Sequence, residues 1–365
     1  MYSKDEKVLL WLDLFDNLTY KKKEQLLAMY KTPSSLYDDF LSSREELSFV
    51  LTSKLYDEMA YLHTEKVLED IIAGLDRRGV VAITQYSNNY PESMNNIDTP
   101  PFVLYCKGDV SLLDKKCFGI VGTRRITNYG RNITEMFAKG LVKMGFCIVS
   151  GLSCGVDTVA HETTLDNNGK TIAVLAGGFD YIYPDINTNL ADIIAKKGLL
   201  ISEIKPTERA KTYYFPIRNR IIAGLSQGVL ITEADEKSGS MHTKNYALDY
   251  GKDVLAVPGN ITSKVSAGCN RIIANGQAKA VCCLDDLYDE YNVKYVPKQK
   301  AIVLTIEEQL IIDALGDEEL YFQEIVEKTK LDTKTLNSLL TTLSFREIIK
   351  KLAGNFYCLI YRKED

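Results

Sequence analysis

A regular alternation of short apolar runs and helical stretches between Lys116 and Val281 most constrains the fold of this 365-residue chain. Runs that are apolar throughout are typical of strands buried on both faces, and strands separated by helices of about 10–20 residues form parallel sheets. The pattern therefore predicts an α/β fold with a doubly wound, mostly parallel sheet. The expected strands are Phe118–Val121, Phe146–Val149, Thr171–Leu175, Leu199–Ser202, Val229–Thr232, Asp253–Val257 and Ala278–Val281.

Different patterns flank this interval on both sides. Residues 1–75 have apolar positions at helical spacing, which predicts a small helical module. Residues 76–298 hold the sheet, preceded by two further strand-like runs at Val80–Ile83 and Phe102–Tyr105. Residues 302–365 combine three helical patterns with two β-prone runs around a Gly-Asn turn, the outline of a winged-helix module. Three modules also suit the length, because one hydrophobic core typically serves about 100–150 residues.

Charge is distributed unevenly along the chain. The net charge of −5 divides into −5 for residues 1–70, +4 for residues 71–301 and −4 for residues 302–365. A basic centre between two acidic modules fits an anion-binding site in the middle of the chain.

Neither membrane anchoring nor a disulfide framework is expected. No run approaches the roughly 20 consecutive apolar residues that a membrane span needs, and the first residues do not resemble a cleaved leader, so we expect a cytoplasmic protein without membrane association. The eight cysteines include no Cys-x-x-Cys pair, which indicates reduced thiols, most of them in the core, and no zinc site. We expect no cofactor and no metal ion.

Gly122, Thr123 and Arg124 directly follow the first strand of the repeat. Ligands of doubly wound sheets bind at the carboxyl ends of strands, so residues at these positions are candidates for function. A glycine allows close approach of the backbone to a phosphate, a helix start offers N–H groups, and an arginine grips phosphate with two donors. The alternative is that Arg124 forms an ion pair with a neighbouring strand end.

Two more strand ends carry small and hydroxyl side chains. Ser150 and Gly151 follow the second strand, and the run from Ser238 to Thr243, which includes Gly239 and Ser240, follows the fifth. Both suit phosphate binding at a helix start. Asp157 and His161 come after the second strand, but no nucleophile completes a catalytic group, so we interpret them as a helix cap and a packing histidine.

The run from Tyr213 to Ile222 joins an aromatic cluster to two arginines, Arg218 and Arg220. Stacking of a base on an aromatic ring contributes about 1–3 kcal/mol, and guanidinium groups bind the backbone, so this combination favours a single strand over a duplex. In the alternative interpretation Phe215 lies in the core and the arginines brace loops.

These motifs together resemble those of the DNA-processing protein A (DprA/Smf) family over about residues 80–281. The match consists of Gly122-Thr123-Arg124, Ser150-Gly151-Leu152 with Gly155-Val156-Asp157 and His161, Tyr183-Pro184, Ser202-Glu203, Phe215-Pro216 with Arg218-Asn219-Arg220, Ser238-Gly239-Ser240, and Pro258-Gly259, in that order. The N-terminal module, of the sterile-alpha-motif or helix-hairpin-helix kind, and the winged-helix module are similar to accessory domains of longer members.

The resemblance implies an extended Rossmann-like domain that binds single-stranded DNA, forms a homodimer around residues 268–276, and loads the RecA recombinase during natural transformation. It implies no enzymatic turnover and no catalytic residue. Phe215 would stack on a base, and Arg218 and Arg220 would hold the strand or the fold. The candidate residues for DNA or phosphate binding are Gly122, Thr123, Arg124, Ser150, Gly151, Lys211, Phe215, Arg218, Asn219, Arg220, Ser238, Gly239, Ser240 and Thr243.

Three positions depart from the pattern of the family. Thr123 stands where members often have Ser, Asp185 stands where they tend to carry a basic residue, and Thr212 stands where they often have Lys. The neighbouring Lys211 is a candidate to replace that lysine. Each lost phosphate contact lowers the affinity and flattens its salt dependence, so we expect weaker binding than is usual for the family.

Two alternatives remain open at this level. One is a nucleotide-binding or nucleotide-hydrolysing Rossmann-like enzyme or sensor related to the lysine-decarboxylase-like phosphoribohydrolases, although their Pro-Gly-Gly-x-Gly-Thr loop has no counterpart after Val257. The other is a regulator that reads duplex DNA through the Thr333–Leu343 helix. The charge of −4 over residues 302–365 opposes this second alternative and favours a protein contact or an autoregulatory role.

Overall fold

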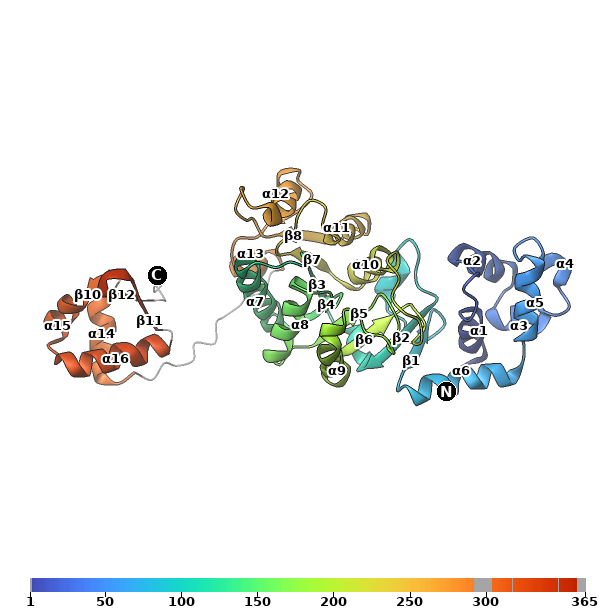
Figure 1. Cartoon of the computed structure of the whole chain (residues 1–365), viewed down its shortest axis with the longest axis horizontal. Helices are drawn as coiled ribbons and strands as arrows, with labels where there is room; N and C mark the ends of the chain where they lie inside the picture. The colour runs from blue at the N-terminus through green and yellow to red at the C-terminus, as the bar shows by residue number, and fades with distance from the viewer. Residues whose placement is uncertain (1, 292–303, 317, 347, 360–365) are drawn as a thin grey trace. The chain divides into compact units, whose positions relative to one another are not determined.

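Nine strands form one sheet in the residues that the computed structural model describes, which are 2–291, 304–316, 318–346 and 348–359 (Figure 1). The chain divides into two compact units whose boundary falls among the residues that are not described, so the domain boundary expected at residues 298–302 also lies outside the described part. The sheet belongs to the first unit, and each unit is considered by itself.

The sheet is mixed and mostly parallel. The strands are β1 (Val81–Thr84), β2 (Val103–Gly108), β3 (Cys117–Val121), β4 (Cys147–Ser150), β5 (Thr171–Val174), β6 (Leu199–Ser202), β7 (Gly228–Ile231), β8 (Asp253–Ala256) and β9 (Lys279–Ala280). Their spatial order is β1-β2-β6-β5-β4-β3-β7-β8-β9. All pairs from β6 to β9 are parallel, whereas β1 pairs with β2, and β2 with β6, in antiparallel fashion. The predicted α/β fold class is confirmed.

The strand order reverses between β3 and β7. From β3 the chain runs outward through β4, β5 and β6 on one side, and then returns to build β7, β8 and β9 on the other. The connections on the two sides leave in opposite directions, so a crevice opens beyond the carboxyl ends of β3 and β7. A ligand site is expected at this switch point.

Helices cover both faces of the sheet. On one face α7 (Asn128–Lys143), α8 (Val156–Asp166) and α13 (Leu284–Glu290) pack on a core that includes Ile148, whereas the next residue, Val149, belongs to the core under the helices of the other face. Those helices are α10 (Tyr214–Leu225), α11 (Ser240–Asp249) and α12 (Ala267–Ala274). The connecting segments hold α9 (Thr188–Lys197) and the short 3-10 helices η1 (Glu92–Asn96), η2 (Val110–Asp114), η3 (Asp185–Asn187) and η4 (Lys264–Ser266).

The N-terminal helices share a hydrophobic core with the sheet. They are α1 (Lys4–Leu12), α2 (Tyr20–Met29), α3 (Pro33–Asp39), α4 (Arg44–Leu47), α5 (Ser53–Tyr61) and α6 (Glu65–Arg77). Trp11 is fully buried at their centre, where its ring meets those of Phe15, Tyr37 and Phe40 edge to face. The same core continues to Val103 of β2. The predicted boundary near residue 75 stays a prediction.

The second unit contains α14 (Ile306–Leu315), α15 (Phe322–Thr329) and α16 (Thr333–Phe345), which pack around Ile311, Ile325 and Leu340. Its sheet has the order β10-β12-β11, formed by β10 (Leu320–Tyr321), β11 (Ile349–Lys351) and β12 (Phe356–Leu359), with the turn η5 (Ala353–Asn355) between the last two strands. Helices and a hairpin thus occur where the sequence predicts them, while the assignment as a winged helix stays a prediction.

All eight cysteines are free thiols in the described part of the chain: four are buried, two are partly buried, and Cys282 and Cys283 are exposed. No helix among the described residues is both long enough and apolar enough to span a bilayer.

Candidate functional site

A cavity of about 580 Å³ opens at the switch point of the sheet. The segments that follow β3, β4 and β7 line it, together with the start of α10. The predicted site residues that line this cavity are Gly122, Thr123, Arg124, Phe215, Arg218, Asn219, Ser238, Gly239, Ser240 and Thr243. The structure therefore brings together residues that are up to 121 positions apart in the sequence, from 122 to 243.

Glu233, which is absent from the predicted set, fixes the loop that carries Arg124. Its backbone carbonyl accepts the N–H of Thr123 at 2.7 Å, and its carboxylate accepts the N–H and the hydroxyl of Thr127 at 2.9 and 2.6 Å. Thr127 in turn caps α7 by accepting the N–H of Gly130 at 3.1 Å. Because this loop is tied to the end of β7, Arg124 extends from a backbone that is held in place.

Arg218 closes the end of β4. Its guanidinium donates to the carbonyl oxygens of Gly151, at 2.6 Å, and of Val174. The absence of a side chain at Gly151 gives the guanidinium its place, since a Cβ there would lie 2.5 Å from the Arg218 nitrogens and displace them. The hydroxyl of Ser150 donates to the carbonyl of Ile120 at 2.6 Å. Ser150 and Gly151 consequently do not line the cavity, in contrast to the sequence prediction, because Arg218 covers the strand end where they lie.

Burial lowers the pKa of Arg218 to about 10, which leaves the guanidinium charged at neutral pH. Asp157 also lies in the cavity wall, where its carboxylate accepts the N–H of Ser153 at 3.2 Å. Burial raises the pKa of Asp157, while the charge of Arg218 opposes that rise. Arg218 thus supplies a permanent positive charge to the wall of the cavity.

His161 is a packing residue, as expected. It is fully buried, and its Nδ1 lies 2.7 Å from the hydroxyl oxygen of Thr171. That hydroxyl donates its own proton to the carbonyl of Ile148, so the ring donates from Nδ1 and stays neutral. Burial, with a smaller effect from Arg218, lowers the pKa of His161 to about 3. The neutral ring does not form a catalytic dyad with Asp157.

Besides Ser150 and Gly151, two more predicted site residues, Arg220 and Lys211, lie outside the cavity. The side chain of Arg220 is 5% exposed. Its guanidinium pairs with Glu203 at 2.7 Å, and its Nε donates to the hydroxyl of Thr99 at 2.9 Å, so this arginine braces the fold. Lys211 pairs with Glu208 at 2.5 Å. Lys211 does not line the cavity, whereas Thr212 does, and a role for Lys211 in place of the lysine missing at Thr212 stays a prediction.

An aromatic wall bounds the cavity on one side. The rings of Tyr183 and Phe215 meet edge to face with centroids 5.5 Å apart, and Tyr183 is 54% exposed. The guanidinium carbon of Arg124 lies 5.1 Å from the centroid of the Phe215 ring. A ring for stacking and a donor for phosphate are thus adjacent, as a nucleotide requires.

The N-terminus of α11 forms a second wall. No side chain caps this helix at Gly239, whose carbonyl accepts a hydrogen bond from Asn219 at 3.2 Å. The hydroxyl oxygens of Ser238 and Ser240 are 2.8 Å apart at the same place. The N–H groups of Ser240, Met241 and His242 donate to the hydroxyl of Ser238 and to the carbonyls of Ser238 and Gly239. The helix start therefore attracts anions through its partial positive charge.

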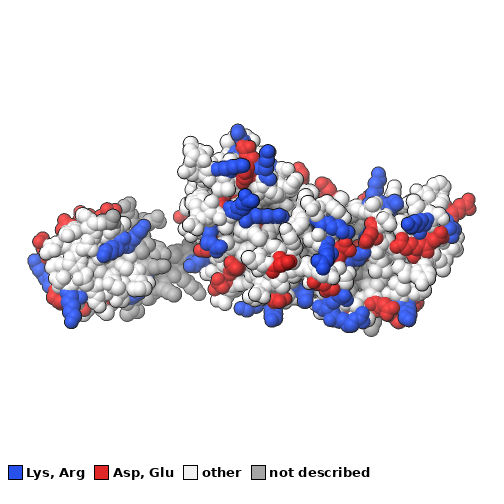
Figure 2. All heavy atoms as spheres, viewed as in Figure 1, with Lys and Arg blue, Asp and Glu red and all other residues white. Residues whose placement is uncertain are grey.

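Four basic side chains (Arg124, Arg125, Arg218 and Lys237) and two acidic ones (Asp157 and Asp235) line the cavity. Within the described part of the chain, Arg124, Arg125 and Lys237 form no ion pair, whereas Asp235 faces Lys264 at 3.8 Å. On the face shown in Figure 2, basic and acidic side chains are interspersed. Arg125, Lys237 and His242 are lining residues that the sequence prediction missed, although each lies beside or within a predicted motif.

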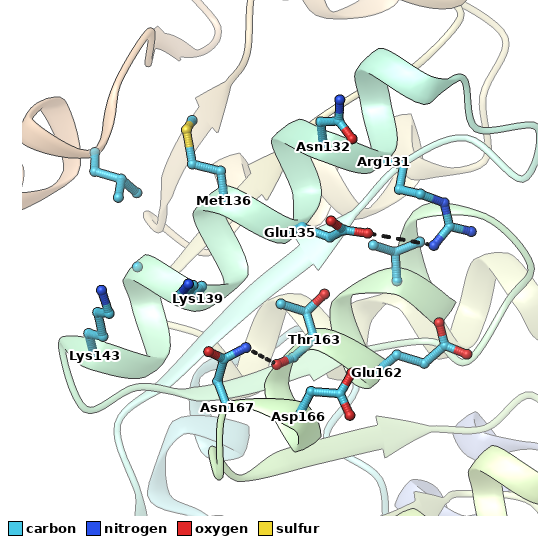
Figure 3. A pocket seen from close by; sticks show the side chains of 13 residues that line it. Arg131, Asn132, Glu135, Met136, Lys139, Lys143, Glu162, Thr163, Asp166 and Asn167 are labelled. Atoms are coloured by element: carbon cyan, nitrogen blue, oxygen red, sulfur yellow. Dashed lines mark hydrogen bonds and ion pairs between the residues drawn. The ribbon is translucent and has the colours of Figure 1, made fainter. Parts of the chain in front are cut away.

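A second cavity, of about 720 Å³, lies between α7 and α8 (Figure 3). Its charges balance, because Arg131, Lys139 and Lys143 line it together with Glu135, Glu162 and Asp166. Arg131 and Glu135 face each other at 3.7 Å. The balanced charge gives this groove no preference for an anion, and it contains none of the predicted site residues. Among the described residues no group of His, Cys, Asp and Glu is arranged to hold a metal ion.

The sequence and the fold have counterparts in one protein family. The sequence model of the family described as DNA recombination-mediator protein A matches residues 81–292. The chain belongs to this family, which confirms the resemblance inferred from its motifs.

Relatives with similar sequences are described as DNA-processing proteins. The DNA processing protein DprA of Bacillus subtilis (strain 168) is 41% identical over 232 residues, which are 62% of this chain and 78% of that protein. The DNA processing protein DprA of Streptococcus pneumoniae (strain ATCC BAA-255 / R6) is 41% identical over 202 residues, 55% of this chain and 71% of that protein.

Two relatives with solved structures share the fold. The X-ray structure of DNA processing protein A from Streptococcus pneumoniae superposes with a TM-score of 0.68 at 31% identity, over 80% of this chain and 99% of that one. The structure of DNA processing protein A from Helicobacter pylori, which describes its single-stranded DNA binding mode, superposes with a TM-score of 0.54 at 33% identity, over 59% of this chain and 97% of that one.

Proposed function

We propose that this protein binds single-stranded DNA, without turnover, in the cavity at the switch point between β3 and β7. The observation that carries the proposal is the convergence of Arg124, Arg125 and Lys237, which have no carboxylate partner in the described residues, with the ring of Phe215. The single-stranded DNA binding mode described for the Helicobacter pylori relative supports the same ligand.

Each side chain has a distinct part in the proposed mechanism. Arg124 grips a phosphate with two donors, and the uncapped N-terminus of α11 at Gly239 attracts the next negative charge. Phe215 stacks on a base. Because bases in a duplex are already stacked on one another, only a single strand offers a base face to this ring, which explains the preference for single strands.

The proposed biological role is to protect incoming single strands and to load RecA onto them during natural transformation, as a homodimer formed around residues 268–276. Ile272 is buried in the core, so the dimer face would use exposed neighbours, such as Ile261, which is 90% exposed. Light scattering of Ile261→Asp against the parent protein tests the dimer. RecA filament assembly on protected single strands, with and without this protein, tests the loading.

We also propose that residues 302–365 form a winged-helix accessory module that contacts protein rather than duplex DNA. Arg346, which directly follows α16, forms an ion pair with Glu308 at 2.8 Å. The helix and its end therefore offer few cations to a DNA groove. Removal of residues 302–365 should leave single-strand affinity unchanged, and complete loss of binding would overturn this assignment.

Fluorescence anisotropy of a labelled oligothymidine, titrated at two salt concentrations, tests the DNA site. Arg124→Ala should weaken binding and reduce the slope of log affinity against log salt by about 0.7, the value for one phosphate contact on a single strand. Lys139→Ala, in the groove between α7 and α8, is the matched control and should bind like the parent protein.

Equal affinity for duplex and single strand, or an Arg124→Ala variant that binds normally, would contradict the proposal. Release of free base from a panel of nucleotides would instead support the enzyme or sensor alternative.

A further inference from the structure

Two loops beside the cavity are joined to each other through their backbones. One follows β5 and the other follows β6. The N–H of Gly178 donates to the carbonyl of Glu208 at 2.8 Å, and the N–H of Asp180 donates to the carbonyl of Pro206 at 3.0 Å. The two loops therefore run side by side, and their side chains form one surface.

This surface carries an exposed cation on an aromatic ring. The guanidinium carbon of Arg209 lies 4.0 Å from the centroid of the Tyr181 ring, which is van der Waals contact. Arg209 is exposed, and Tyr181 is 42% exposed. The ring holds the guanidinium in place without removing its charge, and it leaves the N–H groups open to an acceptor.

The charges next to Arg209 are already neutralised. Asp180 pairs with Arg78 at 3.0 Å, and Glu208 pairs with Lys211 at 2.5 Å. Within the described part of the chain Arg209 itself has no carboxylate partner, and its guanidinium rests on the ring of Tyr181. Arg209 is thus an uncompensated cation on a surface whose neighbouring carboxylates are occupied.

The pair lies next to the aromatic wall of the cavity. Tyr181 and Tyr183 are two positions apart, so their Cα atoms are separated by at most about 7 Å. The intervening Ile182 is partly buried against the core, whereas both tyrosines are exposed. Tyr183 meets Phe215, and Phe215 meets Arg124. Aromatic and cationic groups therefore continue from the cavity onto the joined loops.

We propose that Arg209, supported by Tyr181, is a second platform for single-stranded nucleic acid, which binds the nucleotide that leaves the cavity past Tyr183. A base stacks on the outer face of the guanidinium, and its N–H groups donate to the adjoining phosphate. This inference rests on the proposed function of the cavity and extends the strand path beyond it.

Oligothymidines of two lengths separate the platform from the cavity. Lengths of about 4 and about 16 nucleotides bracket the site sizes of single-strand binding modules. Arg209→Ala and Tyr181→Ala should weaken binding of the long oligonucleotide by about 5- to 150-fold, the equivalent of one lost base stack, and leave the short one unchanged. Tyr181→Phe keeps the ring and should bind like the parent protein.

The outcomes distinguish this inference from the proposed function. Arg124→Ala should weaken both lengths, since it acts in the cavity. If Arg209→Ala changes neither length, or weakens both equally, the second platform is overturned while the cavity site stands. If the parent protein binds neither length, both proposals are overturned. Unfolding curves of the variants should coincide with that of the parent, because both side chains are exposed.

An abasic scan of the long oligonucleotide locates the platform on the strand. Removal of the base that stacks on Arg209 should weaken binding to the parent protein and have no further effect on Arg209→Ala. An equal effect of every abasic position on both proteins would contradict a defined second platform.

Discussion

The carboxylate of Glu233 accepts both the N–H and the hydroxyl of Thr127, at 2.9 and 2.6 Å, and so links the end of β7 to the start of α7. Glu233 is 2% exposed. The bond crosses the switch point of the sheet, where the connections on the two sides diverge. It holds the loop of Arg124 at the place where the proposed ligand enters.

Replacing Glu233 with Gln should lower both stability and DNA affinity. The amide offers one acceptor instead of two, so one donor of Thr127 loses its partner on Glu233, at a cost of about 0.5–1.5 kcal/mol in unfolding free energy. Urea denaturation measures this cost. Glu236→Gln is the control, since Glu236 is an exposed partner of Arg271 and its replacement should leave stability nearly unchanged. Identical denaturation midpoints for the two variants would contradict the role of Glu233.

Phe215→Ala should weaken single-strand binding by about 1–3 kcal/mol, which is the contribution of one stacked base. Phe215→Tyr keeps the ring and should retain the affinity. Anisotropy titrations with oligothymidine compare the three proteins. If Phe215→Ala binds as tightly as the parent, the ring only packs against Tyr183 and is not a stacking platform.

Asp185→Asn should tighten single-strand binding. Asp185 is exposed in η3, two residues beyond Tyr183, and forms no ion pair in the part of the chain that the structure describes. Its negative charge repels the phosphates of a strand that passes Tyr183, so its removal should raise the affinity by a factor of about 3 at low salt. The gain should vanish at high salt, and a gain that is independent of salt would point to another cause.

His161 should make stability depend on pH above the range in which carboxylates titrate. Its pKa is about 3 in the folded protein and about 6.5 in the unfolded chain, so below pH 6.5 the unfolded state binds the additional proton. Unfolding free energy should therefore fall as the pH is lowered from 6.5 to 5, with a slope of up to about 1.4 kcal/mol per pH unit from this group.

His161→Asn is the comparison for that measurement, since the amide can still donate to Thr171 but does not titrate. The difference in slope between the two proteins isolates the histidine from all other groups. Equal slopes between pH 5 and 6.5 would show that the fold does not lower the pKa of His161.

The strands of the sheet were predictable because local composition decides them. A strand such as β6 is apolar up to its final serine and buried on both faces, and Leu199–Ser202 has the same bounds in the prediction and in the structure. The strand ends therefore also identified Gly122, Arg124 and Ser238 as candidates. Their meeting in one cavity follows from the switch point, which the βαβ pattern already implied.

Side-chain partners were not predictable in the same way. Lys211 and Thr212 are neighbours in sequence, yet Lys211 turns to Glu208 while Thr212 lines the cavity. Glu233 is inconspicuous in the sequence, because its function depends on Thr127, a residue 106 positions away. Partners at such separation are chosen by the packing of loops, which local spacing does not encode.

The sequence by itself determined the α/β class, the positions of the strands and the family, because these depend on apolar runs and on motifs read along the chain. The tertiary structure alone decided which candidates face solvent. Arg218 turned inward to cap the carbonyls of Gly151 and Val174, whereas Arg124 stayed at the cavity beside Phe215. The physical reason is that an arginine satisfies whichever acceptors the folded backbone brings within reach, and these come from strands that meet only in three dimensions.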